Sequence, residues 1–332
     1  MQTHPKLIDV WALRLLLATL LFFGAELLLW INPLQHSALE WALRIVGYIA
    51  LATLMLDFAV RYRIREVYDA LVLAGIYGLS VGLLLQPQTS LADYPRTLMT
   101  RVMGGQALIG VEMFGLFLVL TGGHIPRYRR LMLGFSVWLG FYWGIWVRWS
   151  PVLTDFFSTQ VDLVTMFVCA GIIFTLALAL FTFMSRRHPA LTASDLQLSP
   201  MGLGVTLIVL IIVFLVRLAD NAINLAALPA IILLLVLCSA ILWFRRSDKG
   251  KTLFDSHLPP TPLGWLWIVL AIVIFSGAAI ISYNIPLITV FDFNQLSVME
   301  FAFAFGGLVW LPLVAAVFSV RAIDRQAQRL EG

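Results

Sequence analysis

Two acidic residues inside long apolar segments are the side chains of this sequence best placed to do chemistry. Glu112 lies near the middle of segment 103–122, and Glu26 lies in the second half of segment 11–31. A charged side chain inside a membrane is costly, so it usually faces a bundle interior or a water-filled cavity. A carboxyl group in that setting can take up and release a proton as its access to water changes. We therefore expect Glu112 to be a proton carrier or cation ligand, the alternative being a structural carboxyl group bonded to a neighbouring helix.

Three charged residues near the ends of other apolar segments are further candidates. Arg217 and Asp220 are three positions apart, so on a helix they share a face and can pair with each other. The alternative is that Arg217 reaches inward to a buried carboxylate or an anionic ligand. Arg148 lies at the end of a span, where such side chains are mostly solvated, as we expect also for Arg44, Glu40 and Glu300. We expect Glu26 and Arg217 to line a path in a polar cavity that opens to the outside.

Sequence motifs that carry catalysis or hold cofactors are missing from the chain. The five histidines all lie in tails or connections, so neither haem ligation nor a histidine-rich metal site inside a membrane is expected. No zinc-protease, nucleotide-binding, nucleophile-elbow or dinucleotide-binding motif occurs. The two cysteines, Cys169 and Cys238, are interpreted as buried thiols. We therefore expect no cofactor, no metal ion and no catalytic residue, and the missing motifs favour a non-enzymatic role.

The composition indicates the surroundings of these side chains. Of the residues, 61% are hydrophobic and 12% are charged, whereas a soluble domain is nearer half apolar and about a quarter charged. A soluble fold cannot hide so much apolar surface, so we expect a single integral membrane domain over residues 1–332. The net charge of +4 does not indicate nucleic-acid binding, because the basic residues form short clusters between apolar runs.

Apolar segments of membrane-crossing length predict an all-α, polytopic transmembrane helix bundle of about ten spans, since about 20 apolar residues cross a hydrocarbon layer. Basic residues gather in both tails and in alternate connections, which places both termini in the cytoplasm because cytoplasmic loops carry an excess of Lys and Arg. Tryptophans at span ends, Trp146 among them, predict an interfacial belt. The predicted spans lie near 11–31, 41–60, 67–86, 103–122, 131–149, 162–184, 201–219, 222–244, 264–283 and 300–320.

Three local patterns refine this arrangement. Residues 201–244 form nearly one apolar run, which we expect a tight turn at 220–221 to divide into two spans. Residues 284–299 are apolar and aromatic but contain a proline and an aspartate, so we expect them to lie in the interface or to cap the bundle. The spacings Gly78xxxGly82 and Gly140xxxGly144 predict close helix packing.

Two protein families offer partial resemblances. Ten spans with both ends inside resemble the drug/metabolite transporter group, whose members look like two inverted sets of five spans. This resemblance rests on span number and orientation, since the outer connections are longer and no internal repeat is visible. The stretch from Asp9 to Arg14 resembles the opening of membrane acyltransferases, but Glu26 stands where that family has its catalytic histidine.

Three functional hypotheses follow from these patterns. The leading one is a secondary transporter or permease component with a polar site in the outer half of the bundle and a small molecule or ion as substrate. The first alternative is a non-catalytic membrane subunit or scaffold of a larger complex, and the second is a lipid-modifying membrane enzyme. We expect a multi-pass protein of a bacterial plasma membrane that is surrounded by lipids. We also expect it to form a homo-oligomer or to bind a partner membrane subunit, and to bind no nucleic acid.

Overall fold

Long helices make up most of the structure. The computed structural model describes residues 7–29, 36–121, 126–149, 163–187, 191–246, 252–256, 265–286, 289–290 and 293–294. Two π-helical segments occur, η1 (Phe23–Leu29) after the first helix and η3 (Leu98–Gln106) before α5. The long α-helices are α1 (Leu7–Phe22), α2 (Ala38–Arg61), α3 (Val67–Leu84), α5 (Ala107–Thr121), α6 (Pro126–Trp149), α8 (Leu163–Arg187), α9 (Pro200–Ala219), α10 (Leu228–Arg245) and α11 (Trp265–Tyr283).

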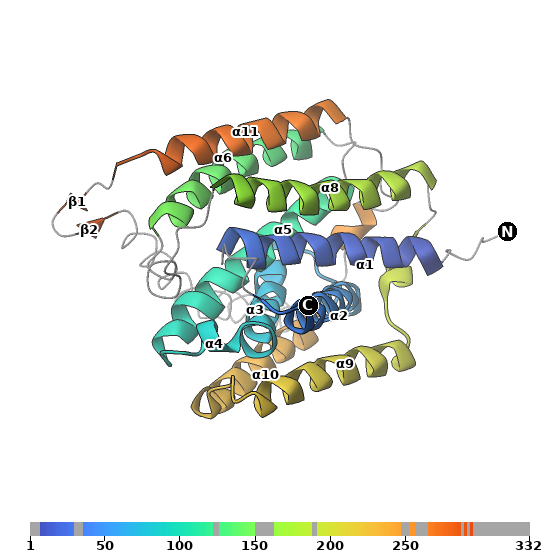
Figure 1. The fold of residues 1–332 in the computed structure, drawn as a ribbon. Coiled ribbons are helices and arrows are strands. Elements are labelled where there is room, and N and C mark those ends of the chain that lie inside the picture. Colours follow the sequence, from blue (N-terminus) through green and yellow to red (C-terminus); the bar gives the residue numbers. More distant parts are fainter. Residues whose placement is uncertain are drawn as a thin grey trace, which may run out of the picture.

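Short elements connect these helices. Strands β1 (Thr289–Val290) and β2 (Phe293–Asn294) form a small antiparallel pair, with Thr289 opposite Asn294, in the stretch that was expected to lie in the interface or to cap the bundle. Figure 1 shows this pair projecting beyond one end of α11. The remaining short elements are helices α4 (Pro87–Ser90), η4 (Ala193–Leu196), η5 (Leu225–Ala227) and η6 (Leu253–Ser256).

Seven helical segments are long and apolar enough to cross a membrane. They are Leu7–Leu29, Ala38–Arg61, Val67–Leu84, Leu98–Thr121, Pro200–Ala219, Leu225–Arg245 and Trp265–Tyr283. Each coincides with one of the predicted spans, and the predicted spans 131–149 and 162–184 coincide with α6 and α8. The predicted span 300–320 lies outside the described residues. The fold is therefore helical and has several apolar helices of the kind that integral membrane proteins need.

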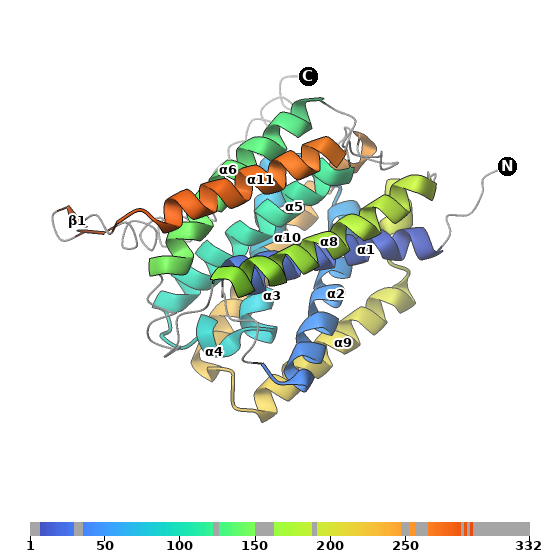
Figure 2. The same cartoon turned by 45° about the horizontal axis from the view of Figure 1, so that its top comes forward.

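The helices form a central group with a pair on each side (Figures 1 and 2). Helices α1, α2, α3 and α5 lie at the centre, α9 and α10 cover one side, and α6 and α11 cover the other. In the most apolar window of each central span, 67–83% of the residues are buried, against 22% in each of α9, α10 and α11. The flanking helices therefore expose apolar faces, as contact with lipid requires.

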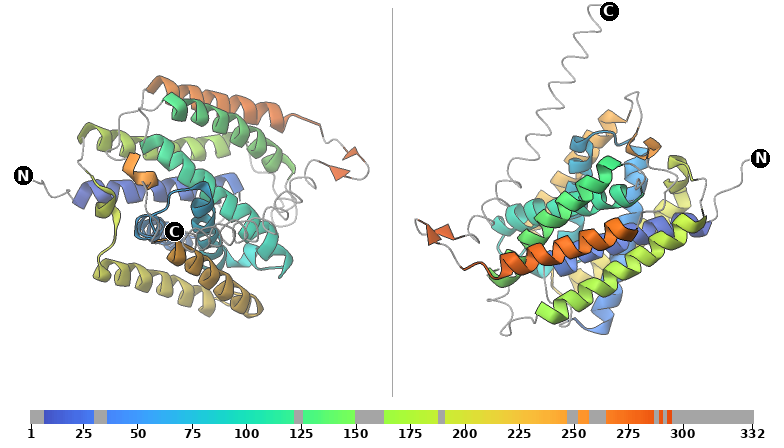
Figure 3. Two further views of the ribbon diagram at one scale, coloured as in Figure 1. Left: turned by 180° about the vertical axis from the view of Figure 1, so that it is seen from behind. Right: turned by 90° about the horizontal axis from the view of Figure 1, so that it is seen from above.

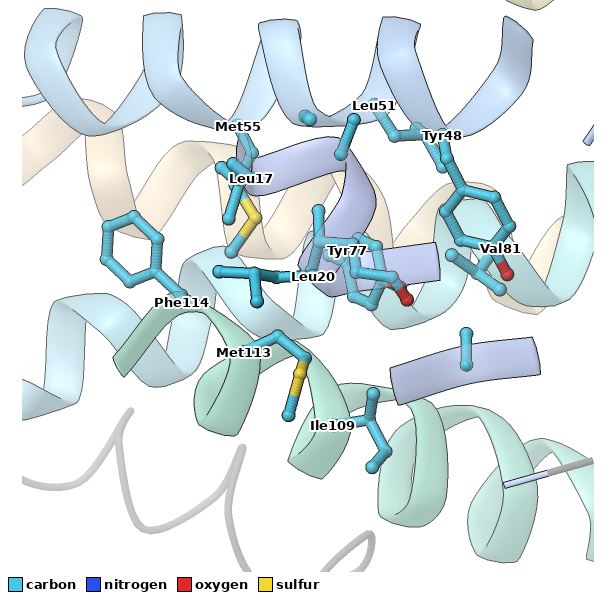
Figure 4. Packing of buried hydrophobic residues seen from close by; sticks show 14 of the residues in the cluster. Leu17, Leu20, Tyr48, Leu51, Met55, Tyr77, Val81, Ile109, Met113 and Phe114 are labelled. Carbon is cyan, nitrogen blue, oxygen red and sulfur yellow. The ribbon is translucent and has the colours of Figure 1, made fainter. Parts of the chain in front are cut away.

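The central helices share one apolar core. Figure 4 shows Leu20 of α1, Met55 of α2, Tyr77 of α3 and Met113 of α5 converging in it. All four side chains are nearly inaccessible to solvent. Such a core fixes the relative positions of the central helices, which carry the polar residues described below.

Basic connections meet at one end of the bundle. Asp57 of α2 accepts hydrogen bonds from Arg61 and from the backbone N–H of Leu198, which precedes α9. Arg245, at the end of α10, pairs with Asp69 at the start of α3. These contacts tie together the connections that follow α2, α8 and α10 in the described part of the chain.

At the opposite end of the bundle, the described connection after α3 is bonded to the end of α9 and to the turn that follows it. Asn224 donates a hydrogen bond to the carbonyl of Leu91, and Arg217 donates one to the carbonyl of Leu84 at the end of α3. These contacts join the connection that follows α3 to α9 and to the turn that follows it.

Helices α6 and α11 run in the same direction and approach closely. A Cβ atom at Gly140 would overlap the carbonyl oxygen of Phe275, and one at Gly144 would overlap that of Ala279. The prediction of close packing at Gly140xxxGly144 is confirmed. This parallel course is what we expect if the predicted spans 131–149 and 264–283 both begin on the same side of a membrane.

The π-helical segment η1 is held by indole groups of α6. The Nε1 atom of Trp143 donates to the carbonyl of Leu27 at 3.1 Å, and that of Trp146 donates to the carbonyl of Leu29 at 2.7 Å. Buried carbonyl groups need such partners, and wide π turns occur frequently at functional sites. Because Trp146 is buried and bonded inside the bundle, its assignment to an interfacial belt is wrong.

Candidate functional site

A buried polar cluster lies where η1, α2, α3, η3 and α9 meet, and we call it the Glu26 cluster. Its members are joined by hydrogen bonds or close ion pairs and come from segments far apart in the sequence. They are Glu26, Glu40, Arg44, Tyr48, Gln86, Gln106 and Arg217.

The carboxylate of Glu26 is fully engaged. The Nη1 atom of Arg44 lies 2.7 Å from each carboxylate oxygen, and the hydroxyl of Tyr48 donates to Oε1 at 2.8 Å. The Nε2 atom of Gln86 donates to the same oxygen at 3.0 Å. Hydrogen bonds to a charged group are about twice as strong as neutral ones. Glu26, which is only 3% exposed, is therefore held by three side chains from two neighbouring segments.

A second carboxylate joins Arg44 to Arg217. The Nη2 atom of Arg44 donates to Oε1 of Glu40 at 2.9 Å, and Nη1 of Arg217 lies 3.6 Å from that oxygen. Arg217 also donates to the carbonyls of Leu84 and Leu85. The cluster thus contains two carboxylates and two guanidinium groups, so its formal charges balance. Balanced and bonded charges can be buried without an external ion.

An amide chain extends the cluster toward α5. Gln106, the last residue of η3, donates through Nε2 to Oε1 of Gln86 at 2.6 Å. Oε1 of Gln106 and Oγ of the nearby Ser90 have no hydrogen-bond partner in the described part of the chain, and both residues are fully buried. Unpaired buried acceptors are costly, so this is the side of the cluster where an additional hydrogen-bond donor would be stabilised.

His36 lies at the rim of the cluster, just before the span formed by α2. Its Nδ1 atom is 3.3 Å from Oε2 of Glu40. Burial and then the positive charge of Arg44 lower the pKa of His36, against the opposing effect of Glu40. The imidazole is therefore neutral at neutral pH and adds no charge to the balanced cluster.

Three of the residues selected from the sequence, Asp220, Arg148 and Glu112, lie outside this cluster. Asp220 forms the C-cap of α9 and makes no ion pair with Arg217 or with any other described residue, so the expected local pairing is wrong. Arg217 instead reaches inward, as the alternative stated. Arg148 donates to the carbonyl of Tyr283 at 2.5 Å and lies over that ring, which fastens the ends of α6 and α11 together.

Glu112 differs from Glu26, Asp57 and Asp69, which are buried carboxylates with bonded partners. It lies in the middle of α5 and is only 4% exposed. Among the described residues it makes no hydrogen bond and no ion pair, and its one electrostatic neighbour is the phenol of Tyr142 on α6. It follows Gln106 by six residues, or about 9 Å along a helix axis. Glu112 is therefore close to the Glu26 cluster but is not bonded to it.

Five members of the cluster, Glu40, Arg44, Tyr48, Gln86 and Gln106, were missed by reasoning from the sequence alone. Arg44 was expected to be solvated, which is wrong because it is buried. A signal was present in the spacing, since Glu40, Arg44 and Tyr48 follow one another at four-residue intervals and share a helix face. Gln86 and Gln106 gave no such signal, because an uncharged amide near the end of a span is ordinary.

Comparisons with known proteins do not assign the chain to a family. No protein-family model, no curated protein and no solved structure matches it. The features of the described residues that indicate a function are therefore Glu112 and the Glu26 cluster.

Proposed function

We propose that the chain is a secondary transporter or permease component in which Glu112 takes up and releases a proton or binds a cation. The observation that supports this proposal is the isolation of Glu112. It is buried in a long apolar helix, and no partner among the described residues compensates a charge there. An ionisable group kept in such a place is costly to a purely structural bundle. Uptake and release of a proton by Glu112 beside a substrate path would explain why an ionisable residue lies there.

The proposal includes a bundle of about ten spans with both termini in the cytoplasm of a bacterial cell. In support, the basic connections after α2 and α10 meet at one end of the bundle through Asp57, Arg61, Asp69 and Arg245. Cytoplasmic loops are the ones that carry such an excess of Lys and Arg. The Glu26 cluster then lies in the outer half of the membrane.

In this proposal the Glu26 cluster is the outer wall of the path rather than its binding group. Glu26 is fully bonded and paired with Arg44, so a passing cation would have to break that pair. The cluster also fixes η1 against α2 and the end of α3, beside the helix that carries Glu112. Glu26 and Arg217 thus border the path, and Glu112 takes up and releases the proton or binds the cation.

Proton flux in reconstituted vesicles tests this proposal. The purified chain is placed in liposomes that contain a pH-sensitive dye, and a pH gradient is imposed. A panel of amines, amino acids, sugars and inorganic cations is then added outside. At least one compound is expected to change the rate at which the gradient decays. Glu112→Gln should remove that response, because an amide cannot exchange a proton.

Asp93→Asn is the matched control, since it makes the same chemical change at an exposed residue whose partner is Arg96. This variant should retain the response of the wild-type chain. A flux that is equal in Glu112→Gln and wild type would overturn the role of Glu112. If no compound couples to proton movement, the transporter proposal itself fails.

A non-catalytic subunit of a membrane complex is the second candidate. The closed Glu26 cluster favours it, because a sealed carboxylate–arginine contact is what a static scaffold needs. Purification in a mild detergent distinguishes the two proposals. An unvarying partner protein at fixed stoichiometry, together with unchanged proton flux, would favour the subunit. No observation on the described residues favours a lipid-modifying enzyme.

A further inference from the structure

A cavity of about 270 Å³ lies where η1, α5, α6, α8 and α11 meet. Its wall is built mainly from large apolar side chains of these five elements. They include Phe23, Met113, Leu139, Phe174, Ile272 and Phe275. An apolar cavity of about 150 Å³ is already large enough to stay dry and bind a benzene molecule. This cavity is therefore large enough to hold part of a hydrocarbon chain.

The few polar groups in the wall offer little to a polar ligand. Among the described residues, no charged side chain lines the cavity, and three hydroxyl groups do. Ser136 donates its hydroxyl to the carbonyl of Met132, and Thr175 donates its hydroxyl to that of Gly171, so both bond within their own helices. A polar ligand would lose hydrogen bonds to water on entering such a wall, whereas a hydrocarbon would lose none.

The cavity opens between α8 and α11. Gly171 and Thr175 on α8 and Ile272 on α11 belong to its wall and are exposed, which marks the mouth. Figure 3 shows from above that α8 and α11 run along the same face of the bundle. Because α11 is long and apolar enough to cross a membrane, this mouth would face the lipid chains of a bilayer. Met113 and Leu139, by contrast, lie on the buried side of the wall.

We propose that this cavity binds the hydrocarbon chain of a membrane lipid that enters between α8 and α11. A chain that moves from the bilayer into the cavity exchanges one apolar surrounding for another, so the hydrophobic effect adds almost nothing. Binding depends instead on contact with the cavity wall, and filling the cavity should weaken it without affecting insertion of the protein. The inference does not depend on proton exchange at Glu112.

Photolabelling tests the proposal. The full chain is reconstituted in vesicles of phosphatidylethanolamine and phosphatidylglycerol, the latter with a diazirine on one acyl chain, and labelled peptides are identified by mass spectrometry after irradiation. Every outward face will be labelled, so the informative positions are the buried Met113 and Leu139. Wild type should be labelled at both. Absence of label there would overturn the proposal.

A bulky residue at the mouth provides the second arm. A Cβ at Gly171 meets no atom within 4 Å, so Gly171→Leu adds bulk without a backbone clash. Label at the buried positions should fall about tenfold, which corresponds to about 1.4 kcal/mol, because the added side chain occupies the mouth of the cavity. Gly204→Leu on α9, where a Cβ also meets nothing within 4 Å, is the matched control and should leave the label unchanged. Equal label in both variants would contradict the site, and Thr175→Leu repeats the test at the mouth if Gly171→Leu does not fold.

Discussion

The two buried glutamates of this bundle have opposite surroundings. Glu26 is bonded to Arg44, Tyr48 and Gln86 within the Glu26 cluster. Glu112 has nearly the same exposure but no hydrogen bond or ion pair with any described residue. Burial alone therefore does not distinguish a structural carboxylate from a functional one. In our proposal the number of partners makes the distinction: the partners of Glu26 stabilise its charge, whereas Glu112 has no bonded partner among the described residues and its charge is free to change.

Removal of Arg44 should cause the largest loss of stability. Arg44→Met leaves Glu26 as a buried charge without its cation, and breaking a buried pair in this way costs about 3–5 kcal/mol. Thermal unfolding in detergent would measure the change. The double variant Glu26→Leu with Arg44→Met should recover much of the loss, since no uncompensated charge then remains.

Arg96→Met is the control for this prediction. Arg96 is 75% exposed and pairs with Asp93 at the surface, where such a pair contributes about 0–1 kcal/mol. A loss in Arg44→Met no larger than that in Arg96→Met would mean that the Glu26 cluster does not stabilise the bundle. The contrast between the two glutamates would then have no energetic basis.

Replacing Glu26 by glutamine should lower the stability of the bundle more than the same replacement at Glu112. Glu26→Gln removes a charge from hydrogen bonds that are worth about 1.5–3 kcal/mol each, and it leaves Arg44 only Glu40 as a counter-charge. Glu112→Gln loses no hydrogen bond or ion pair to a described residue, so its stability should change by less than about 1 kcal/mol. Chemical unfolding of both variants under one set of conditions makes the comparison. Equal losses would show that Glu112 has a partner as strong as that of Glu26.

The sequence predicted where these glutamates lie but not their difference. The long apolar segments predicted that Glu26 and Glu112 lie inside helices. That prediction needs only the local sequence, because a span requires a long apolar run whichever helices pack beside it. Their partners depend on helix packing. Arg44 seemed solvated because it lies at the end of a predicted span, but in the folded bundle it is buried and bonded to Glu26 of η1. Among the described residues, Gln106 joins the cluster only through Gln86, a contact that no local pattern indicates.

The indole of Trp143 tests whether the backbone around Glu26 is as firmly held as its carboxylate. Trp143→Phe removes the donor to the carbonyl of Leu27 and leaves that carbonyl buried, which should cost about 1–2 kcal/mol. Trp138→Phe, at an exposed position of the same helix, is the control and should cost less. If thermal unfolding gives the same loss in both, the π-helical segment does not depend on α6 for its stability.

The smallest effect on stability is expected from His36 at the rim of the Glu26 cluster, and it should depend on pH. The pKa of His36 is lowered in the folded chain, chiefly by burial and then by Arg44. Protonation therefore favours the unfolded chain. Stability should be highest above about pH 6.5, the ordinary value for histidine, and should fall as the pH drops through the lowered folded pKa. His36→Gln should remove that part of the pH dependence in thermal unfolding between pH 5 and pH 7.5. If the stability of His36→Gln depends on pH as that of the wild type does, groups other than His36 cause the loss of stability in acid.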